Sequence, residues 1–372
     1  MSFFLTDIIN YFYILFLIYF FYVKKIIDLN QLVLLSISSL SPIFMFGFLF
    51  QEDSIYFGDA SFYAWSLEQA KLFYFDKLYH TKDIIYSSVI FSFVPIPFFN
   101  SPNSVGFICK IIFVLLICLL NYFKINKNYS YLFIIMPSSI LYSGIGTKDT
   151  LVAFFMILGF IAIAKNNYFF LIVSLLILIN IKTQNVVFLI LFFVFYQLLF
   201  YRTPIKLVSS IFIVGALFLG FKSKITHYLS LVNLNNYYRD FQHANNVPID
   251  SIEEIPFLNE SILFHLDDFV LGNYRFFLLP NPFEAINSFQ FIQSIENYLV
   301  IFILIMIIYR CLKSNLYKSL FWIFGLFFMA GLYGLIIDNY GTLVRMKFSI
   351  ILSFLIILLY ESQIDNKKIK NE

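Results

Sequence analysis

The stretch from Val105 to Phe123 reads VGFICKIIFVLLICLLNYF, and it decides the class of fold. It contains a single charged side chain, Lys110, and an α-helix of about 20 apolar residues spans the roughly 30 Å hydrocarbon core of a bilayer. Similar apolar runs recur along the chain, which is 60% hydrophobic and 13% charged. Soluble domains carry about 25% charged residues. The composition therefore excludes a soluble protein and predicts an integral membrane protein.

We expect an all-α bundle of about eleven membrane-spanning helices, in a single integral membrane domain that covers residues 1–372. The expected spans are residues 8–23, 31–50, 105–123, 130–146, 149–164, 167–181, 184–201, 205–221, 297–312, 318–337 and 345–360. Several are short for a full crossing, which predicts tilting or local thinning of the bilayer. Segment 86–100 contains Pro95 and Pro97. Proline has no backbone N–H, and lipid offers no other donor to the carbonyl groups that are left unpaired. We therefore expect this segment to be re-entrant or interfacial.

The charges of the connections predict an orientation. With the N-terminus placed outside, the inside segments hold 13 basic and 4 acidic residues, whereas the outside loop 222–296 holds 4 basic and 9 acidic residues. Basic residues gather on the cytoplasmic side of a membrane. The first loop, residues 51–104, and the large loop, residues 222–296, are therefore expected outside. We expect the chemistry of the protein to take place at that outer face.

The first candidate site is the segment Pro137–Asp149, which reads PSSILYSGIGTKD and joins two apolar runs. We expect Thr147 to cap the next helix, with Lys148 and Asp149 in its first turn, where free N–H groups and the helix dipole favour anions. The pattern fits a phosphate or pyrophosphate cradle. The alternative is an ordinary interhelical turn whose lysine extends to water.

The second candidate is Asp338–Lys347, which reads DNYGTLVRMK and precedes the last span. Arg345 and Lys347 are expected near the outer end of that span, where positive charge is disfavoured. A planar guanidinium can donate two hydrogen bonds to phosphate oxygens, so an anionic ligand would offset the cost of placing it there. The alternative is that Arg345 pairs with Asp338 at the helix end.

Two further segments carry weaker candidates. In Asn273–Glu284, Arg275 lies among aromatic residues, where it could stack on sugar rings, hold phosphate or only anchor an interfacial helix. In Gly58–Trp65, Asp59 could act as a general base and Trp65 could stack on a sugar or belong to an interfacial aromatic belt. Arg239 belongs to the large loop. No metal site is expected, because one acidic pair in that loop is too little.

Three segments of the chain together resemble a known family. They are Pro-Ser-x4-Ser-Gly-x-Gly-x-Lys-Asp at 137–149, Tyr-Arg-Phe-Phe-Leu-Leu-Pro-Asn-Pro-Phe at 274–283 and Asn-Tyr-Gly-Thr-x2-Arg-x-Lys at 339–347. In these segments, and in its layout along nearly the whole chain, the sequence resembles the O-antigen and capsule polymerases (Wzy-like proteins). An eleven-span layout with the N-terminus outside departs from the even-numbered layout of that group.

The resemblance implies polymerisation of oligosaccharide repeat units carried on undecaprenyl pyrophosphate, at the periplasmic face of the bacterial inner membrane. It implies no cofactor and no nucleic-acid partner; the implied partners are the lipid-linked oligosaccharide, membrane lipid and a protein that regulates chain length. Arg345, Lys148 and Arg275 would stabilise the charge of the leaving pyrophosphate. Asp59 or Asp149 would orient or deprotonate the acceptor. The remaining expected substrate contacts are Lys347, Arg239, Trp65 and Tyr340.

Two alternative functions stay open. One is a membrane glycosyltransferase that uses a polyprenyl-phosphate sugar and relies on Asp59. The other is a flippase or transporter of lipid-linked oligosaccharides. Transporters commonly show internal repeats and charged residues near the bilayer midplane, whereas this sequence shows no repeat and its charges gather at the outer ends of the spans.

Overall fold

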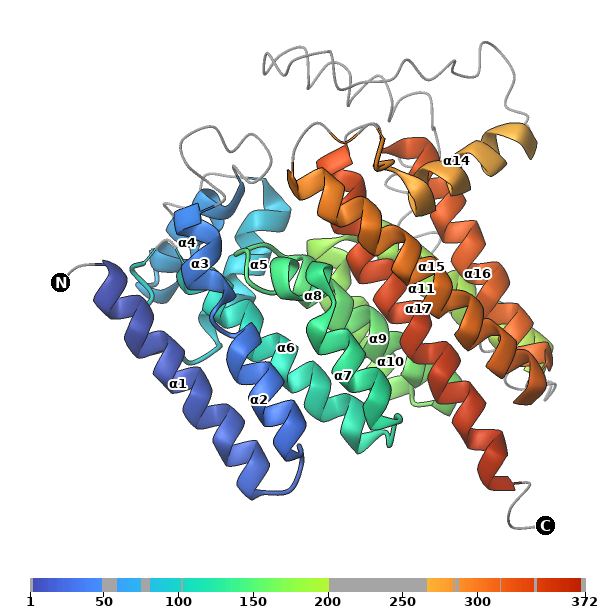
Figure 1. The fold of residues 1–372 in the computed structure, drawn as a ribbon, viewed down its shortest axis with the longest axis horizontal. Helices are drawn as coiled ribbons and strands as arrows, with labels where there is room; N and C mark the ends of the chain where they lie inside the picture. Colours follow the sequence, from blue (N-terminus) through green and yellow to red (C-terminus); the bar gives the residue numbers. More distant parts are fainter. Residues whose placement is uncertain are drawn as a thin grey trace.

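The computed structural model describes residues 3–48, 59–74, 81–101, 103–200, 266–283, 285, 288–314, 316–337 and 340–368. Across these residues every regular element is a helix, as the sequence predicts (Figure 1). The expected span 205–221 and most of loop 222–296 lie outside the described residues. The helices are α1 (Phe3–Val23), α2 (Leu29–Ser38), α3 (Ser41–Phe48), α4 (Asp59–Lys71), α5 (Lys82–Ser92), α6 (Ser104–Tyr122), α7 (Lys127–Ile135), α8 (Pro137–Tyr142), α9 (Asp149–Lys165), α10 (Tyr168–Ile181), α11 (Thr183–Phe200), α14 (Leu266–Leu278), α15 (Ser288–Ser314), α16 (Leu316–Ile336) and α17 (Tyr340–Lys368).

Five of the described helices are long and apolar enough to cross a membrane. The crossing segments are Leu5–Val23, Ser104–Tyr122, Thr183–Phe200, Gln290–Lys313 and Leu343–Ser362. They differ in how deeply they are buried within the protein. In the most apolar 18-residue stretch of each helix, 94% of the residues are buried in α17 and 83% in α6, but only 28% in α1. Helices α6 and α17 therefore form the centre of the bundle and α1 its periphery. The count of eleven crossings stays a prediction.

Two expected spans are each divided into two helices. Span 31–50 consists of α2 and α3, which are separated at Ser39 and Leu40. Span 130–146 consists of α7 and the short α8, which are separated at Met136. Met136 takes φ −60° and ψ 129°, because the ring of the following Pro137 disfavours helical backbone at the residue before it. The expectation of continuous helices in these two places was wrong.

The proline-containing segment 86–100 starts as α5 and continues without regular structure after Ser92. Two side chains of α1 satisfy its polar groups. The Asn10 amide donates to the Phe98 carbonyl at 2.7 Å and accepts from its N–H at 3.0 Å. Asp7 accepts hydrogen bonds from the Ser101 hydroxyl and from the Asn103 amide. With 11 residues, α5 is too short to cross a bilayer. The re-entrant placement of this segment stays a prediction.

Aromatic side chains join the central helices. The Phe160 ring of α9 lies 4.9 Å from the Phe354 ring of α17, 5.1 Å from the Trp322 ring of α16 and 5.5 Å from the Phe192 ring of α11. Gly325 makes room for this cluster, since a Cβ there would lie 2.5 Å from the Phe192 ring. Burying several aromatic rings in one place fixes how these four helices pack.

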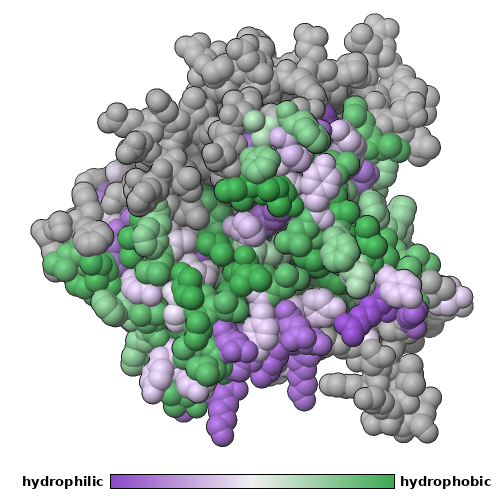
Figure 2. All heavy atoms as spheres, viewed as in Figure 1, coloured by the Kyte–Doolittle hydropathy of each residue, from purple (hydrophilic) through white to green (hydrophobic). Residues whose placement is uncertain are grey.

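Basic and other hydrophilic side chains gather at one end of the bundle. The connections α1–α2, α6–α7 and α15–α16 and the C-terminal end of α17 lie at one end, which we term the basic end (Figure 1). There Lys127 pairs with Asp28 at 3.2 Å, and Arg310 donates to the Tyr129 hydroxyl at 2.9 Å. Hydrophilic side chains gather along this edge, below a largely apolar surface (Figure 2). The sequence predicted these connections to be cytoplasmic, and their cytoplasmic location stays a prediction.

Candidate functional site

The turn between α8 and α9 packs directly onto the first turns of α6. A Cβ on Gly106 would lie 2.3 Å from the Gly144 carbonyl oxygen, and one on Gly146 would lie 2.8 Å from the Val105 Cβ. Larger residues at either position would push the turn away. Gly106 of α6 and Gly146 of the turn therefore allow the close contact that sets where α9 begins. Its N-cap residue is Lys148, so the expected cap by Thr147 was wrong.

Arg345 and Asp149 form an ion pair between α17 and α9. Arg345 Nε donates to Asp149 Oδ2 at 2.9 Å, and the Thr147 hydroxyl donates to the same oxygen at 2.8 Å. Both charged side chains are buried, with exposed fractions of 12% and 4%. The two candidate motifs at 137–149 and 338–347 thus meet in space. The expected alternative partner of Arg345, Asp338, lies outside the described residues.

Lys148 has a carboxylate partner as well. Its ammonium pairs with Asp83, which lies in the first turn of α5. The Lys148 side chain is 10% exposed and that of Asp83 is 38% exposed, so this pair lies nearer the surface than Arg345 and Asp149 do. Asp83 was not among the expected site residues. No local motif marks it, because its partner lies 65 residues away in the sequence.

Lys347 contacts a different set of residues from Arg345. Its ammonium donates to the Leu279 carbonyl and, at 3.3 Å, to Asn297 Oδ1. Successive residues of an α-helix are rotated by about 100°, so two residues separated by one position project about 200° apart. Arg345 accordingly faces α9, whereas Lys347 faces α15 and the end of α14. The two cations of the last motif do not share one site.

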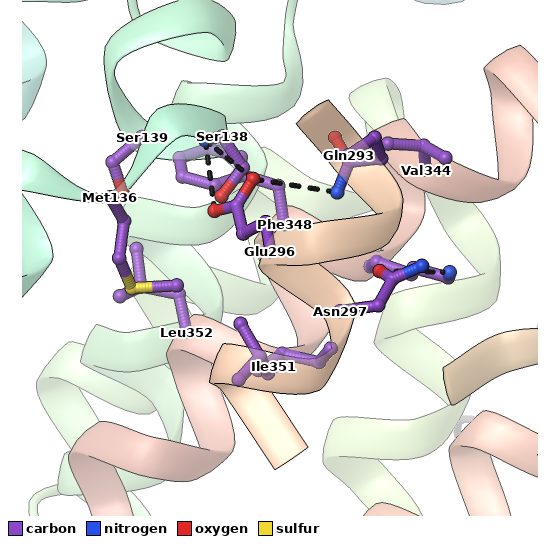
Figure 3. A pocket seen from close by; sticks show the side chains of 12 residues that line it. Met136, Ser138, Ser139, Gln293, Glu296, Asn297, Val344, Phe348, Ile351 and Leu352 are labelled. Carbon is purple, nitrogen blue, oxygen red and sulfur yellow. Dashed lines mark hydrogen bonds between the residues drawn. The ribbon is translucent and has the colours of Figure 1, made fainter. Parts of the chain in front are cut away.

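Glu296 of α15 is a buried carboxylate that the sequence analysis missed. Both of its oxygens accept from the Ser138 N–H at 2.9 Å, at the start of α8, and the Gln293 amide donates to it at 3.4 Å (Figure 3). Gln293, Glu296 and Asn297 follow the i, i+3, i+4 spacing that places side chains on one helix face. That polar triad at the start of an apolar run was the available signal.

Tyr142 connects the ion pair to the Glu296 side of α17. Its ring lies 5.6 Å from that of Phe348, which belongs to the same helix as Arg345 and lines the pocket that also contains Glu296. Tyr142 and Phe348 are both buried. The two polar groups are thus neighbours across a pair of aromatic rings, in a setting from which bulk water is excluded.

Arg275 lies in the last turn of α14, a helix that packs against α16. It is buried, with an exposed fraction of 7%, and Phe277 beside it packs on Phe327 of α16 with ring centroids 5.6 Å apart. One turn later, the Leu279 carbonyl accepts from Lys347. Arg275 is therefore built into a packed helix end, and its expected role in binding substrate stays a prediction.

The other expected residues are not brought to this place by the described contacts. Trp65 lies in α4 and is 41% exposed. Asp59 begins α4 and Tyr340 begins α17, but their side chains are outside the described part of the protein, as is the whole of Arg239. Among the side chains that the structure describes, no group of three His, Cys, Asp or Glu residues is arranged to hold a metal ion.

Lys110 occupies a third polar position, inside the bundle. This lysine of α6 is 1% exposed, and its ammonium donates to the Ser143 hydroxyl at 2.8 Å, to the Ser38 hydroxyl at 2.9 Å and to the Ile140 carbonyl at 3.2 Å. Ser38 ends α2, and Ile140 belongs to α8. Lys110 therefore links the two divided helices to each other, with neutral oxygens as its bonded partners.

The geometry is suited to binding an anion. Lys148 begins α9, and the largely buried Arg345 of α17 reaches Asp149 in the first turn of that helix. A phosphate can replace a carboxylate on a guanidinium because both accept two parallel hydrogen bonds. In a site shielded from water such charges interact more strongly than at a surface. Comparisons of the chain with protein-family models, with curated proteins and with solved structures found no match.

Proposed function

We propose that this protein polymerises oligosaccharide repeat units carried on undecaprenyl pyrophosphate, at the periplasmic face of a bacterial inner membrane. A hydroxyl oxygen of the next lipid-linked unit attacks the anomeric carbon of the growing chain. The bond between that carbon and the pyrophosphate oxygen breaks, and undecaprenyl pyrophosphate leaves with the bonding electrons. The hydroxyl proton passes to a carboxylate of the protein.

The observation that carries this proposal is the ion pair between Arg345 and Asp149, next to Lys148. Pyrophosphate is already a good leaving group, so the reaction needs neutralisation of charge more than it needs a strong acid. Preorganised cations in a water-shielded site supply that neutralisation without reorganising during the reaction. In the proposal, Asp149 and Asp83 hold the two cations in position until the pyrophosphate replaces them.

The placement of these ion pairs in the bundle supports a periplasmic site. Lys148 and Asp149 begin α9, whose other end carries Lys165 within 4.3 Å of the Phe123 ring at the basic end. Arg345 likewise lies near the start of α17, whose other end belongs to the basic end. Since basic connections favour the cytoplasm, the ion pairs would face the opposite compartment.

The second candidate function, a flippase or transporter of lipid-linked oligosaccharides, is favoured by one observation. Helices α2–α3 and α7–α8 are both divided, and Lys110 bonds to residues of both. Transporters place their substrate sites at divided helices of this kind. Against this, the carbonyl and hydroxyls around Lys110 leave its ammonium fully bonded, which favours a structural lysine.

The surface glycan of a deletion strain tests the proposal. We expect deletion of the gene to leave surface polysaccharide with a single repeat unit. Arg345→Ala should reproduce that phenotype when its expression is raised until the amount of protein in the membrane matches the wild type. Arg310→Ala is the matched control, because Arg310 is an exposed arginine at the basic end that bonds to Tyr129. Arg310→Ala should keep the wild-type chain length.

Other glycan patterns would overturn the proposal. Complete absence of surface polysaccharide in the deletion strain points to the transporter or to an earlier transferase. Loss of all glycan in Asp59→Asn, with Arg345→Ala tolerated, would support the glycosyltransferase that uses a polyprenyl-phosphate sugar. Wild-type chain lengths in Arg345→Ala would remove Arg345 from the reaction.

A further inference from the structure

A small pocket lies beside Glu296, on the face of α17 that carries Lys347 (Figure 3). Six of its lining residues are polar and six are apolar. The polar part consists of Ser138, Ser139, Gln293, Glu296, Asn297 and Lys347, and the apolar part of Met136, Val300, Val344, Phe348, Ile351 and Leu352. The polar residues come from the start of α8 and from α15 and α17, three elements that are distant in the sequence.

One polar atom in this wall has no hydrogen-bond partner. The Ser139 hydroxyl is fully buried and makes no hydrogen bond. Among the described residues, several other buried side-chain atoms also lack a partner, but Ser139 is the one of these residues that lines this pocket. A buried hydroxyl without a partner has lost the hydrogen bonds that water would give it, which is unfavourable. Most buried polar groups have a partner in the protein or in ordered water, so a hydroxyl at a pocket can take its partner from whatever occupies that pocket.

Together, the other polar groups of the pocket offer both donors and acceptors of hydrogen bonds. The Glu296 carboxylate accepts, the Gln293 amide does both, and the Lys347 ammonium is already bonded to Leu279 and Asn297. A negatively charged ligand would meet the Glu296 carboxylate at close range, which is unfavourable. The donor set therefore fits a neutral group that donates one hydrogen bond and accepts another, and an alcohol hydroxyl is such a group.

The apolar residues of the wall limit which hydroxyl-bearing groups can fit the pocket. Met136, Val300 and Leu352 offer apolar contact next to the polar groups, and the pocket is too small for a whole sugar ring. A hydroxymethyl group, or another hydroxyl-bearing edge of a sugar, presents a carbon to the apolar side and a hydroxyl to Glu296 and Ser139.

We propose that this pocket binds a neutral, hydroxyl-bearing edge of the acceptor sugar, and that Ser139, Gln293 and Glu296 form hydrogen bonds to it. The inference rests on the proposed function and adds to it a second subsite. In this arrangement Arg345 and Lys148 bind the pyrophosphate on one side of α17, and the pocket holds the neutral sugar on another. The Tyr142 and Phe348 rings lie between the two subsites.

The competing occupant is water. Small polar cavities in proteins commonly hold an ordered water that bonds to groups such as the Ser139 hydroxyl. Water and a sugar hydroxyl satisfy the same atoms, so the test must measure whether a sugar closes the pocket to a reagent.

Cysteine labelling makes that measurement. Ser139→Cys is introduced into full-length protein in lipid nanodiscs, with Cys109, Cys118 and Cys311 replaced by alanine, and its reaction with a small methanethiosulfonate is timed. The probe is the repeat-unit oligosaccharide released by mild hydrolysis from the surface polysaccharide of the source strain, free of lipid and phosphate. When the oligosaccharide is present at about ten times its Kd, about a tenth of the pockets are free, so we expect the labelling of Ser139→Cys to slow about tenfold. Inorganic pyrophosphate should leave the labelling rate unchanged.

Ser130→Cys in the same background is the matched control. Ser130 of α7 also has a buried hydroxyl without a hydrogen-bond partner, but it does not line the pocket. Its labelling rate should not respond to the oligosaccharide. Equal slowing at both positions, no slowing at Ser139→Cys, or a Ser139→Cys that the reagent never reaches would each overturn the inference and favour a water-filled cavity.

The outcomes separate this inference from the proposed function. If the deletion strain carries single repeat units and Ser139→Cys shows no protection, the polymerase proposal stands and the subsite fails. If the deletion strain keeps its full polysaccharide while the oligosaccharide still protects Ser139→Cys, the pocket binds sugar and the polymerase proposal fails. A Glu296→Gln variant that abolishes protection while keeping wild-type Tm would assign the binding to that carboxylate.

Discussion

Arg345 Nε and Asp149 Oδ2 lie 2.9 Å apart, and this contact joins residues separated by 196 positions in the sequence. It links the first turn of α9 to the last long helix of the chain. Because both side chains are buried, the pair can be tested by stability as well as by activity.

Removing one partner of this pair should destabilise the protein strongly. A buried charge that loses its counter-charge typically costs about 3–5 kcal/mol, whereas replacing both charges with apolar residues is often close to neutral. We therefore expect Arg345→Met and Asp149→Leu each to lower the Tm in detergent. The double variant should be more stable than either single variant. Additive losses in the double variant would show that the two side chains do not interact.

The docking of α14 on α16 should depend on Gly334. A Cβ at Gly334 would lie 1.9 Å from the Gly272 carbonyl oxygen, a backbone atom that cannot move aside without shifting α14. Overpacking of this kind costs about 1–3 kcal/mol. We expect Gly334→Ala to lower the Tm and to shorten the glycan, because α14 leads into Leu279, which holds Lys347.

Phe324→Ala is the control for that variant, since Phe324 lies on the same helix and is 71% exposed. Its Tm should stay close to that of the wild type. A Gly334→Ala protein with wild-type Tm and glycan would mean that α14 is free to shift without consequence for Lys347.

Lys110→Met should separate the two candidate functions. Methionine has a similar length and no charge. The bonded partners of Lys110 are two hydroxyls and a carbonyl, so the substitution leaves no counter-charge unpaired. If the protein is a polymerase whose cations are Arg345 and Lys148, the Lys110→Met strain should keep the wild-type chain length and Tm. Complete loss of surface glycan at wild-type Tm would instead support the transporter, because the divided helices meet at Lys110.

The stability of the turn between α1 and α2 should depend on pH through Asp28, which caps α2. The Asp28 carboxylate accepts hydrogen bonds from the Gln31 N–H at 2.9 Å and from the Tyr131 hydroxyl at 2.6 Å. Burial alone would raise the pKa of Asp28, but the hydrogen bonds from Tyr131 and Gln31 and the contact with Lys127 lower it below its usual 3.8. A carboxyl whose pKa is lower in the folded state stabilises the fold above its unfolded pKa. That stabilisation is lost as the pH falls below 3.8.

Asp28→Ala is the variant that measures this effect. An N-cap carboxylate is worth about 1 kcal/mol, so Asp28→Ala should have a lower Tm than the wild type at pH 7. The difference should shrink when both proteins are unfolded at about pH 3, because the wild-type carboxyl is then partly protonated. A Tm difference that does not change between these two pH values would contradict the assignment.

The sequence predicted the class of fold and part of the candidate site. Apolar runs and the charge deficit predicted an all-helical membrane protein, and the motifs at 137–149 and 338–347 contain residues that meet as Asp149 and Arg345. Composition cannot locate a helix break, so spans 31–50 and 130–146 were expected to be continuous, although Pro137 marked the second break. Spacing along one chain also cannot show which distant carboxylate pairs with a lysine, and Asp83 was missed for that reason.

Helix rotation explains another difference. Arg345 and Lys347 stand two residues apart and were expected to bind an anion together. The period of an α-helix separates them by about 200°, which places Lys347 against Asn297 and Leu279 instead. Glu296 could have been found from its i, i+3, i+4 neighbours, Gln293 and Asn297, which stand at the start of an apolar run.

The placement of Arg345 and Lys347 on different faces of α17 has a mechanical consequence. A helix packed on all sides moves as a rigid rod, so an axial slide or a turn that adjusts the contact of Arg345 with Asp149 also displaces Lys347 from Leu279 and Asn297. A movement of α17 therefore changes the contacts on both of its faces at once. Ligands that bind at the two faces would change each other's affinity by equal factors, because linkage between two sites is reciprocal.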